Sequence, residues 1–312
     1  MSDLEEVRLR WGRDSAGWPQ VGSSRIVRTP GLSWRVVIAG EGPDLLLLHG
    51  AGGSSHSWAG LLPSLSREYR VVAPDLPGHA FTSAPPTDRS ALPDMAAAVT
   101  DLMDAVGASP TGIVTHSAGA AVAVFMIQEG AVHPRAWAAI APSLVRPSKG
   151  APPQVIQDLL APVFRSSGLA LLSAAFGRRG RIADALLSST GSQVPPASRD
   201  LYRRLVGNPA HVGSVLRLMA GWDPDPVTRR LGEVDVPGLV VAGDRDGWIP
   251  MSDVHAAVDR LPDVSLRVLP GRGHLLHEEV PDRVLELLLP FLRRNIHGAG
   301  RDEPMTPSHQ GE

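Results

Sequence analysis

The chain has 312 residues, a formal net charge of −2 and no cysteine. A nearly balanced charge excludes a general electrostatic attraction to nucleic acid, and the lack of cysteine excludes disulfides, thiolate nucleophiles and cysteine-ligated metal sites. Hydrophobic residues make up 43% and charged residues 20% of the chain, as in an ordinary globular protein. The acidic start lacks the pattern of a signal peptide, and no stretch reaches ~20 apolar residues, so a cytoplasmic location is expected.

Strands and helices alternate through the first part of the chain, which we assign to residues 1–143. Alternation of this kind favours a mostly parallel sheet with helices on both faces. Apolar or β-branched runs predict the strands, and apolar residues at helical spacing predict the helices. The predicted strands are 25–29, 33–39, 45–48, 69–73, the run that ends at His116, and 136–141; the predicted helices are 56–65 and 94–106.

The alternation stops near Pro142 and returns after residue 225. Residues 144–225 have a helical pattern without a convincing strand, which predicts a helical cap inserted into the sheet domain. Residues 226–296 complete the sheet domain, and residues 297–312 are polar and rich in glycine, proline and serine, as in a disordered tail. The elements expected in this last part are strands 238–242 and 265–269 and helices 252–261 and 281–295.

A sharp strand-to-helix turn is predicted at Ser117. The strand residues Ile113-Val114-Thr115-His116 lead directly into small residues that continue as a helix. Such a turn is a nucleophile elbow, in which the serine side chain projects above the end of the sheet. The usual motif is G-x-S-x-G, and Thr115 replaces its first glycine, so we expect strain or a wider turn there. The alternative is that Ser117 only caps a helix.

An acid and a base follow the serine in the order that an elbow nucleophile requires. Asp246 comes after the apolar strand 238–242, and His274 comes after strand 265–269. Side chains at the carboxyl ends of parallel strands meet at one edge of the sheet, so Ser117, Asp246 and His274 are expected to form a catalytic triad. Asp244 is the alternative acid and His277 the alternative base.

Backbone N–H groups are predicted to form an oxyanion hole beside Ser117. Ala118 is the residue after the nucleophile, and Ala51 and Gly52 lie in a glycine-rich loop that follows the strand 45–48. The alternative for this loop is an ordinary turn. The eleven histidines show no metal-ligand spacing supported by carboxylates, so neither a metal nor another cofactor is expected.

Together these segments resemble the α/β-hydrolase superfamily over residues 33–295. The resemblance rests on His49-Gly50, Asp75-Leu76-Pro77-Gly78-His79, Thr115-His116-Ser117-Ala118-Gly119, Gly243-Asp244-Arg245-Asp246 and Gly273-His274. Ala80 stands where many relatives have glycine. An aspartate nucleophile, as in dehalogenases and epoxide hydrolases, is disfavoured because residue 117 is serine.

Further phrases resemble the magnesium-chelatase accessory proteins of bacteriochlorophyll synthesis. They are Trp18-Pro19, His56-Ser57-Trp58, Ala80-Phe81-Thr82, Ser189-Thr190-Gly191-Ser192, Asn208-Pro209-Ala210-His211-Val212 and Gly221-Trp222-Asp223. This resemblance implies a photosynthetic bacterium, a role around magnesium insertion into protoporphyrin IX, and a tetrapyrrole or magnesium-chelatase subunits as partners. The other interpretation is a general serine carboxylesterase that acts on a small-molecule ester unrelated to pigment synthesis.

A basic cluster in the cap gives one more hypothesis. An apolar helical face beside arginines can lie on an anionic membrane or receive a substrate's carboxylates. The alternative is that the apolar face roofs the pocket while the arginines stay solvated. The residues concerned are Leu169, Leu171, Leu172, Phe176, Arg178, Arg179 and Arg181.

Overall fold

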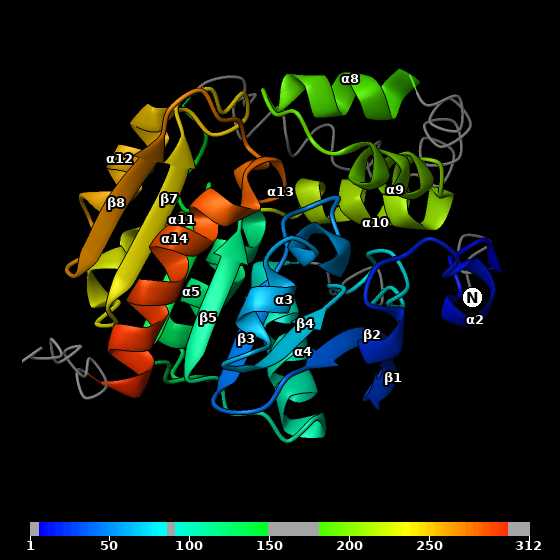
Figure 1. The fold of residues 1–312 in the computed structure, drawn as a ribbon, viewed down its shortest axis with the longest axis horizontal. Coiled ribbons are helices and arrows are strands. Elements are labelled where there is room, and N and C mark those ends of the chain that lie inside the picture. Colours follow the sequence, from blue (N-terminus) through cyan, green and yellow to red (C-terminus); the bar gives the residue numbers. More distant parts are fainter. Residues whose placement is uncertain (1–5, 86–90, 149–180, 299–312) are drawn as a thin grey trace, which may run out of the picture.

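A single eight-stranded sheet organises the protein in the computed structural model, which describes residues 6–85, 91–148 and 181–298 (Figure 1). The strand order is β1-β2-β4-β3-β5-β6-β7-β8. Strand β2 runs antiparallel to β1 and β4, and the other neighbours pair in parallel. The mostly parallel sheet predicted from the sequence is therefore confirmed.

The strands follow the predicted apolar runs to within one or two residues at each end. They are β1 (Ser24–Thr29), β2 (Leu32–Ala39), β3 (Asp44–Leu48), β4 (Arg70–Pro74), β5 (Gly112–His116), β6 (Ala136–Ile140), β7 (Gly238–Gly243) and β8 (Val264–Leu269). Every residue of β5, β6 and β7 is buried, because helices cover both faces of the sheet there.

Helices surround the sheet and form the cap. Among the described residues they are α2 (Trp11–Asp14), η1 (Val21–Ser23), η2 (Ser55–Trp58), α3 (Leu62–Leu65), α4 (Leu92–Ala105), α5 (Ala118–Gln128), α8 (Arg181–Ser189), α9 (Pro196–Val206), α10 (Pro209–Ala220), α11 (Asp225–Arg229), η3 (Leu231–Glu233), α12 (Met251–Val258), α13 (Leu276–Glu279), α14 (Pro281–Leu292) and η4 (Arg293–His297).

The sheet divides the core into two layers. Alternate side chains of β3 point to opposite faces, so Leu46 and Leu48 join one core while Leu45 and Leu47 join the other. The first core contains residues of α4, α5, α11 and α12, and the second contains residues of α3, α13 and α14. This double covering explains why β3 is a continuous run of leucines.

The cap helices α8, α9 and α10 lie over one end of the sheet, above the loops that follow β3, β5, β7 and β8 (Figure 1). The described part of the cap is helical, as predicted. The apolar and basic stretch from Leu169 to Arg179 lies outside the described residues, as does most of the tail, so the domain boundaries at 143, 225 and 296 remain predictions.

The predicted helix over residues 56–65 is wrong, because the structure has two short helices, η2 and α3, in its place. Gly60 lies between them, and a Cβ added there would be 2.7 Å from the Cβ of Pro281. Pro63 also cannot donate a backbone hydrogen bond to a preceding helical turn. Helix η2 therefore ends before Gly60, where the chain packs against α14, and helix α3 begins after it.

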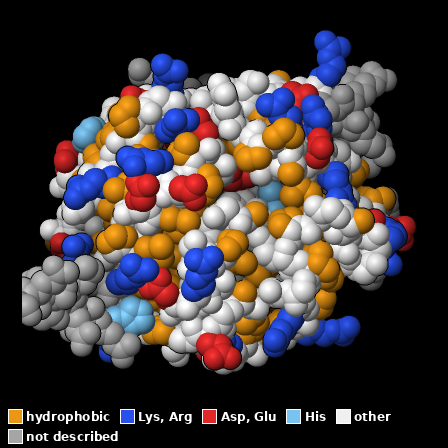
Figure 2. Space-filling view, viewed as in Figure 1, with side chains coloured by type: hydrophobic (Ala, Val, Ile, Leu, Met, Phe, Trp, Pro, Cys, Tyr) orange, Lys and Arg blue, Asp and Glu red, His pale blue; other side chains and the backbone are white. Residues whose placement is uncertain are grey.

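Two broader features bear on partners. Within residues 6–85, 91–148 and 181–298, no helix is long and apolar enough to cross a membrane. The face shown in Figure 2 mixes positive, negative and apolar side chains without one large field of a single sign. This mixture agrees with the nearly balanced charge of the whole chain.

Candidate active site

Ser117 has the backbone conformation of a nucleophile elbow. It stands between β5 and α5 with φ 50° and ψ −120°, outside the regions that L-residues usually occupy. Its side chain makes no capping hydrogen bond to α5. Gly119 explains the need for small neighbours, because a Cβ there would lie 2.4 Å from the carbonyl oxygen of Leu48. The turn thus packs the helix against the end of β3, and the serine hydroxyl makes no hydrogen bond within the described part of the chain.

Thr115 does not carry the strain that its unusual position suggested. Its φ is not positive, and its buried hydroxyl donates a hydrogen bond to the carbonyl oxygen of Ala138 on β6 at 3.2 Å. The unfavourable backbone conformation lies at Ser117 instead. A threonine is accommodated here because the neighbouring strand supplies an acceptor for its hydroxyl.

His274 and Asp246 form a buried pair. His274 Nδ1 donates to Asp246 Oδ2 at 2.8 Å, and the two side chains are 1% and 2% exposed. The other carboxylate oxygen, Oδ1, accepts from the backbone N–H groups of Trp248 at 2.7 Å and Ile249 at 2.8 Å. Asp246 is therefore fixed on both oxygens, and it holds His274 in the tautomer that leaves Nε2 unprotonated.

The two alternative residues have other contacts. Asp244 is exposed and accepts a hydrogen bond from the N–H of Gly271 at 2.6 Å, so it joins two turns. His277 is buried against Trp58, with ring centroids 5.1 Å apart. Burial lowers the pKa of His277 to about 3, so this imidazole is neutral. The structure brings Asp246 to His274 and places neither Asp244 nor His277 in that pair.

His116 connects the elbow to the histidine loop. Its Nε2 donates to the carbonyl oxygen of His274 at 3.0 Å, and the two rings are 4.7 Å apart between centroids. Because His116 directly precedes Ser117, this bond ties the elbow to the loop that carries His274. Nε2 of His274 is buried and has no hydrogen-bond partner among the described residues. Nucleophile activation needs a hydrogen bond from the hydroxyl of Ser117 to this nitrogen. The described structure does not form it, and such bonds often tighten only when a substrate is bound.

Backbone N–H groups are available on both sides of Ser117. Ala118 begins α5, so its N–H has no acceptor within the helix. In the described structure the N–H groups of Ala51 and Gly52 donate to no backbone carbonyl, while Gly53 donates to Gly50 at 3.1 Å and closes the loop. Gly52 has φ +77°, which favours glycine. The N–H groups of Ala51, Gly52 and Ala118 are therefore available to a ligand, and the oxyanion hole that they were predicted to form stays a prediction.

The cap histidine His211 ties this loop to the core. Its Nε2 donates to the carbonyl oxygen of Gly52 at 3.2 Å, and its Nδ1 accepts from the N–H of Ala80 at 3.1 Å. Ala80 has φ +42°, a backbone conformation that favours glycine. The hydrogen bond from its N–H to His211 helps to hold an alanine in this conformation. Burial lowers the pKa of His211 well below its usual value, so the ring is a neutral connector.

A second cap segment holds the loops that carry Asp246 and His274. The carbonyl oxygen of Thr190 accepts from the N–H of His274 at 2.9 Å and from that of Gly247 at 3.2 Å. Ser192 Oγ accepts from the N–H of Leu275 at 2.8 Å. Gly191 lies so close that an added Cβ would be 2.1 Å from the carbonyl oxygen of Arg245. Residues 189–192, which we call the clasp, therefore hold both loops in position by backbone and side-chain hydrogen bonds.

Gly191→Ala is expected to slow covalent labelling of Ser117 by a fluorophosphonate about 10- to 100-fold. The methyl group would push the clasp away from the two loops, and a displacement near 1 Å can cost about 10²-fold in rate. Gly130→Ala is the matched control, since Gly130 has φ +66° and its Cβ would meet nothing closer than 3.8 Å. Both variants carry similar backbone strain, so equal labelling rates would contradict a positioning role for the clasp.

Three further residues of the site have no local sequence signal. Tyr202 of α9 donates from Oη to Oε1 of Glu278 at 2.6 Å, and burial raises the pKa of Glu278 to about 7. Trp248 lies beside His274 with ring centroids 5.1 Å apart. Glu278 followed by Glu279 looks like the solvated surface of a helix, and a lone tyrosine or tryptophan is typical of any core. These side chains become recognisable only through their tertiary contacts.

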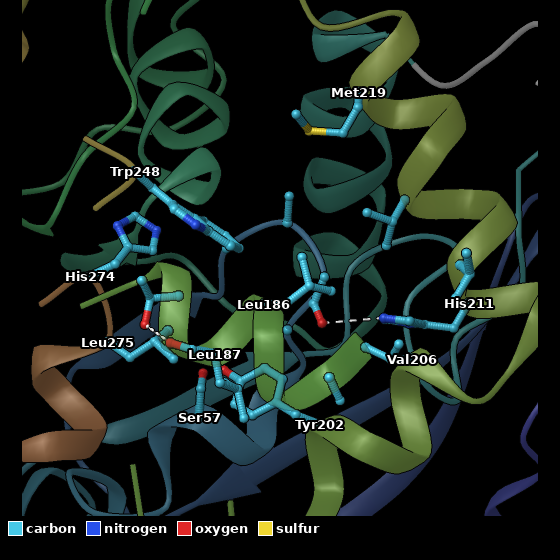
Figure 3. A pocket seen from close by; sticks show the side chains of 18 of the residues that line it. Ser57, Leu186, Leu187, Tyr202, Val206, His211, Met219, Trp248, His274 and Leu275 are labelled. Carbon is cyan, nitrogen blue, oxygen red and sulfur yellow. Dashed lines mark hydrogen bonds between the residues drawn. The ribbon is translucent and has the colours of Figure 1, made fainter. Parts of the chain in front are cut away.

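A cavity of about 380 Å³ lies between the cap and the sheet. Its lining includes the loop 50–53, His116 and His274, which adjoin Ser117. Figure 3 shows His274 and Trp248 on one side of it and His211 on the other. Within the part of the chain that the structure describes, no group of three or more histidine or acidic side chains is arranged to hold a metal ion. The described lining thus contains the oriented imidazole of His274 and the N–H groups of Ala51 and Gly52, with His116 next to Ser117 in the chain.

These features are those of the α/β hydrolases. The model of the Alpha/beta hydrolase family matches residues 45–287, and the chain belongs to this family. A crystal structure of an α/β-hydrolase-fold protein from Burkholderia ambifaria superposes with a TM-score of 0.72 at 23% identity, over 86% of this chain and 99% of that one. This similarity confirms the predicted fold.

Two relatives connect the chain to particular proteins. It is 32% identical over 280 residues to the magnesium-chelatase 30 kDa subunit of Rhodobacter capsulatus, covering 89% of this chain and 97% of that protein. It is 31% identical over 261 residues to a pimeloyl-[acyl-carrier protein] methyl ester esterase of Xanthomonas campestris pv. campestris, covering 82% and 97%. The first confirms the resemblance drawn from the sequence, and the second fits the hydrolase alternative.

Proposed function

We propose that the protein is a serine hydrolase that cleaves an ester, with Ser117 as nucleophile, His274 as general base and Asp246 as its orienting partner. The observation that carries this proposal is the buried 2.8 Å pair of Asp246 and His274, which leaves Nε2 of His274 free beside the elbow. The relation to a methyl ester esterase agrees with ester chemistry.

The reaction follows from the roles of these groups. Ser117 Oγ attacks the ester carbonyl carbon while its proton moves to Nε2 of His274. The negative charge that develops on the carbonyl oxygen is stabilised by N–H groups of Ala118 and of Ala51 or Gly52. His274 then returns the proton to the departing alkoxide, which leaves as an alcohol. Water, deprotonated by His274, attacks the acyl-enzyme, and the bond to Ser117 Oγ breaks to release a carboxylic acid. His274 returns the proton to Oγ, which restores the serine hydroxyl and the neutral base.

A second candidate is an accessory role in magnesium insertion into a tetrapyrrole. It is favoured by the relation to the Rhodobacter capsulatus subunit, which extends over nearly the whole of that protein. In this role the protein would contact magnesium-chelatase subunits, and the triad would be secondary. The two candidates differ in whether the Ser117 hydroxyl is needed.

The test of the hydrolase proposal is covalent labelling by a fluorophosphonate, which reacts with an activated serine whatever the substrate. We expect one label per chain, located at Ser117 by peptide mass spectrometry and blocked by heat denaturation. Denatured protein is the control, because an ordinary serine hydroxyl is a poor nucleophile without its base. A folded protein that remains unlabelled would contradict the proposed triad.

A further inference from the structure

The cavity beside the proposed triad has no side-chain charge in its described lining. None of the described residues that form it is aspartate, glutamate, lysine or arginine. Apolar side chains from the cap form most of its described walls, among them Val215 and the labelled Leu186, Leu187, Val206 and Met219 of Figure 3. An ionised group of a ligand would find no counter-charge among the described lining residues, and burying a charge without one is strongly unfavourable.

The polar side chains of the lining, His274 aside, have already donated their hydrogens within the protein. This holds for a serine, a threonine, a tyrosine, a tryptophan and two histidines. The donor–acceptor pairs are Ser57 Oγ to Ser54 O, Thr190 Oγ1 to Leu187 O, Tyr202 Oη to Glu278 Oε1, Trp248 Nε1 to Ser189 Oγ, His116 Nε2 to His274 O and His211 Nε2 to Gly52 O.

The two histidine rings add no positive charge at neutral pH. Burial lowers the pKa of His116 and of His211 well below the usual value. Each ring also has a single tautomer, because its Nε2 donates to a backbone carbonyl oxygen. In the described lining, the donors left for a ligand are thus backbone N–H groups, among them those of Ala51 and Gly52.

We propose that the cavity binds the uncharged, apolar acyl group of an ester, with its carbonyl at the N–H groups of Ala51, Gly52 and Ala118. This inference rests on the proposed function and names its substrate class. The cavity volume of about 380 Å³ lies at the lower end of the range for small-molecule pockets, roughly 300–1,000 Å³. An acyl group that carries a carboxylate, as a tetrapyrrole propionate does, lacks any partner in the described lining.

The experiment compares p-nitrophenyl acetate, p-nitrophenyl hexanoate and the p-nitrophenyl monoester of adipic acid. Each buried methylene is expected to raise kcat/KM about fourfold, so hexanoate should exceed acetate about 10²-fold. The adipate monoester has the same chain length as hexanoate but ends in a carboxylate, and we expect its kcat/KM to be at least about 100-fold lower. Turnover of the adipate monoester within threefold of hexanoate would overturn the inference.

Variants show whether this cavity sets the preference. Val215→Trp fills the cavity from α10 and should remove most of the advantage of hexanoate over acetate, measured as the ratio of their kcat/KM values. Ala220→Trp is the control, because Ala220 lies at the end of the same helix and does not line the cavity. Loss of the hexanoate advantage in both variants, or in neither, would place the acyl group elsewhere.

Binding separates this inference from the hydrolase proposal. If no ester is cleaved and Ser117 is not labelled, the hydrolase proposal fails, but calorimetric binding of the same three esters still tests the cavity. Ser117→Ala prevents turnover during such titrations. Binding of hexanoate at least tenfold tighter than the adipate monoester supports an uncharged, apolar ligand, and equal or reversed affinities contradict it.

Discussion

Ser117→Ala is expected to lower kcat/KM for a short activated ester by at least about 10³-fold while the protein remains folded. The loss is large because the variant has no nucleophile, and removing a triad member costs several orders of magnitude. The fold should persist because the change deletes one oxygen that makes no capping bond to α5. Steady-state hydrolysis of p-nitrophenyl acetate, with circular dichroism for folding, measures both parts.

Ser66→Ala provides the control for this prediction. Ser66 is partly buried at the end of α3, and its hydroxyl makes only a long bond of 3.5 Å to the carbonyl oxygen of Pro63. Its substitution removes the same atom far from the elbow and should leave kcat/KM within twofold. If Ser117→Ala kept more than about a tenth of wild-type activity, the serine would not be the nucleophile.

The same variant separates ester chemistry from an accessory role. A ligand-contacting hydroxyl contributes only ~1 kcal/mol net, so a binding function should survive its removal. If the accessory role is the function, Ser117→Ala should therefore impair magnesium-porphyrin accumulation only in part in a strain that lacks the native protein. Complete loss, with the variant folded and present at the wild-type level, would make acyl chemistry the function in pigment synthesis.

The elements that carry local signals could be predicted from the sequence. Ser117 and Asp246 follow the buried strands β5 and β7, and His274 follows the partly exposed edge strand β8. Such strands are visible as runs rich in leucine, valine and isoleucine. Parallel topology then places their carboxyl ends at one edge. The preference for Asp246 over Asp244 also rested on local turn chemistry, and the structure shows the reason, since Asp244 accepts from Gly271 in a neighbouring turn.

Contacts between the cap and the sheet domain could not be predicted in the same way. His211 reaches Gly52 and Ala80 across more than a hundred residues, and Thr190 reaches His274 across more than eighty. Such contacts depend on how the cap packs against the sheet domain. The local periodicity of the sequence carries no information about this packing. The break at Gly60 has a similar origin, because it follows from the close approach of Pro281.

Asp246→Asn is expected to reduce kcat for ester hydrolysis by about 10³- to 10⁴-fold with little change in folding. The Oδ1 atom of Asp246 accepts from the N–H groups of Trp248 and Ile249, so an asparagine at this position must keep its amide oxygen there. Its NH₂ group then faces Nδ1 of His274 and donates to it. The imidazole would be forced to carry its proton on Nε2, where it cannot accept the proton of Ser117.

Asp244→Asn is the matched control, two residues away in the same loop. An asparagine at 244 can still accept from the N–H of Gly271, and this exposed residue does not contact His274. Its kcat should stay within about threefold of wild type, and thermal unfolding of both variants should remain close to wild type. A similar loss of activity in the two variants would mean that the loop is sensitive to any change in charge. A loss confined to Asp246→Asn would instead identify the tautomer of His274 as the property that this carboxylate controls.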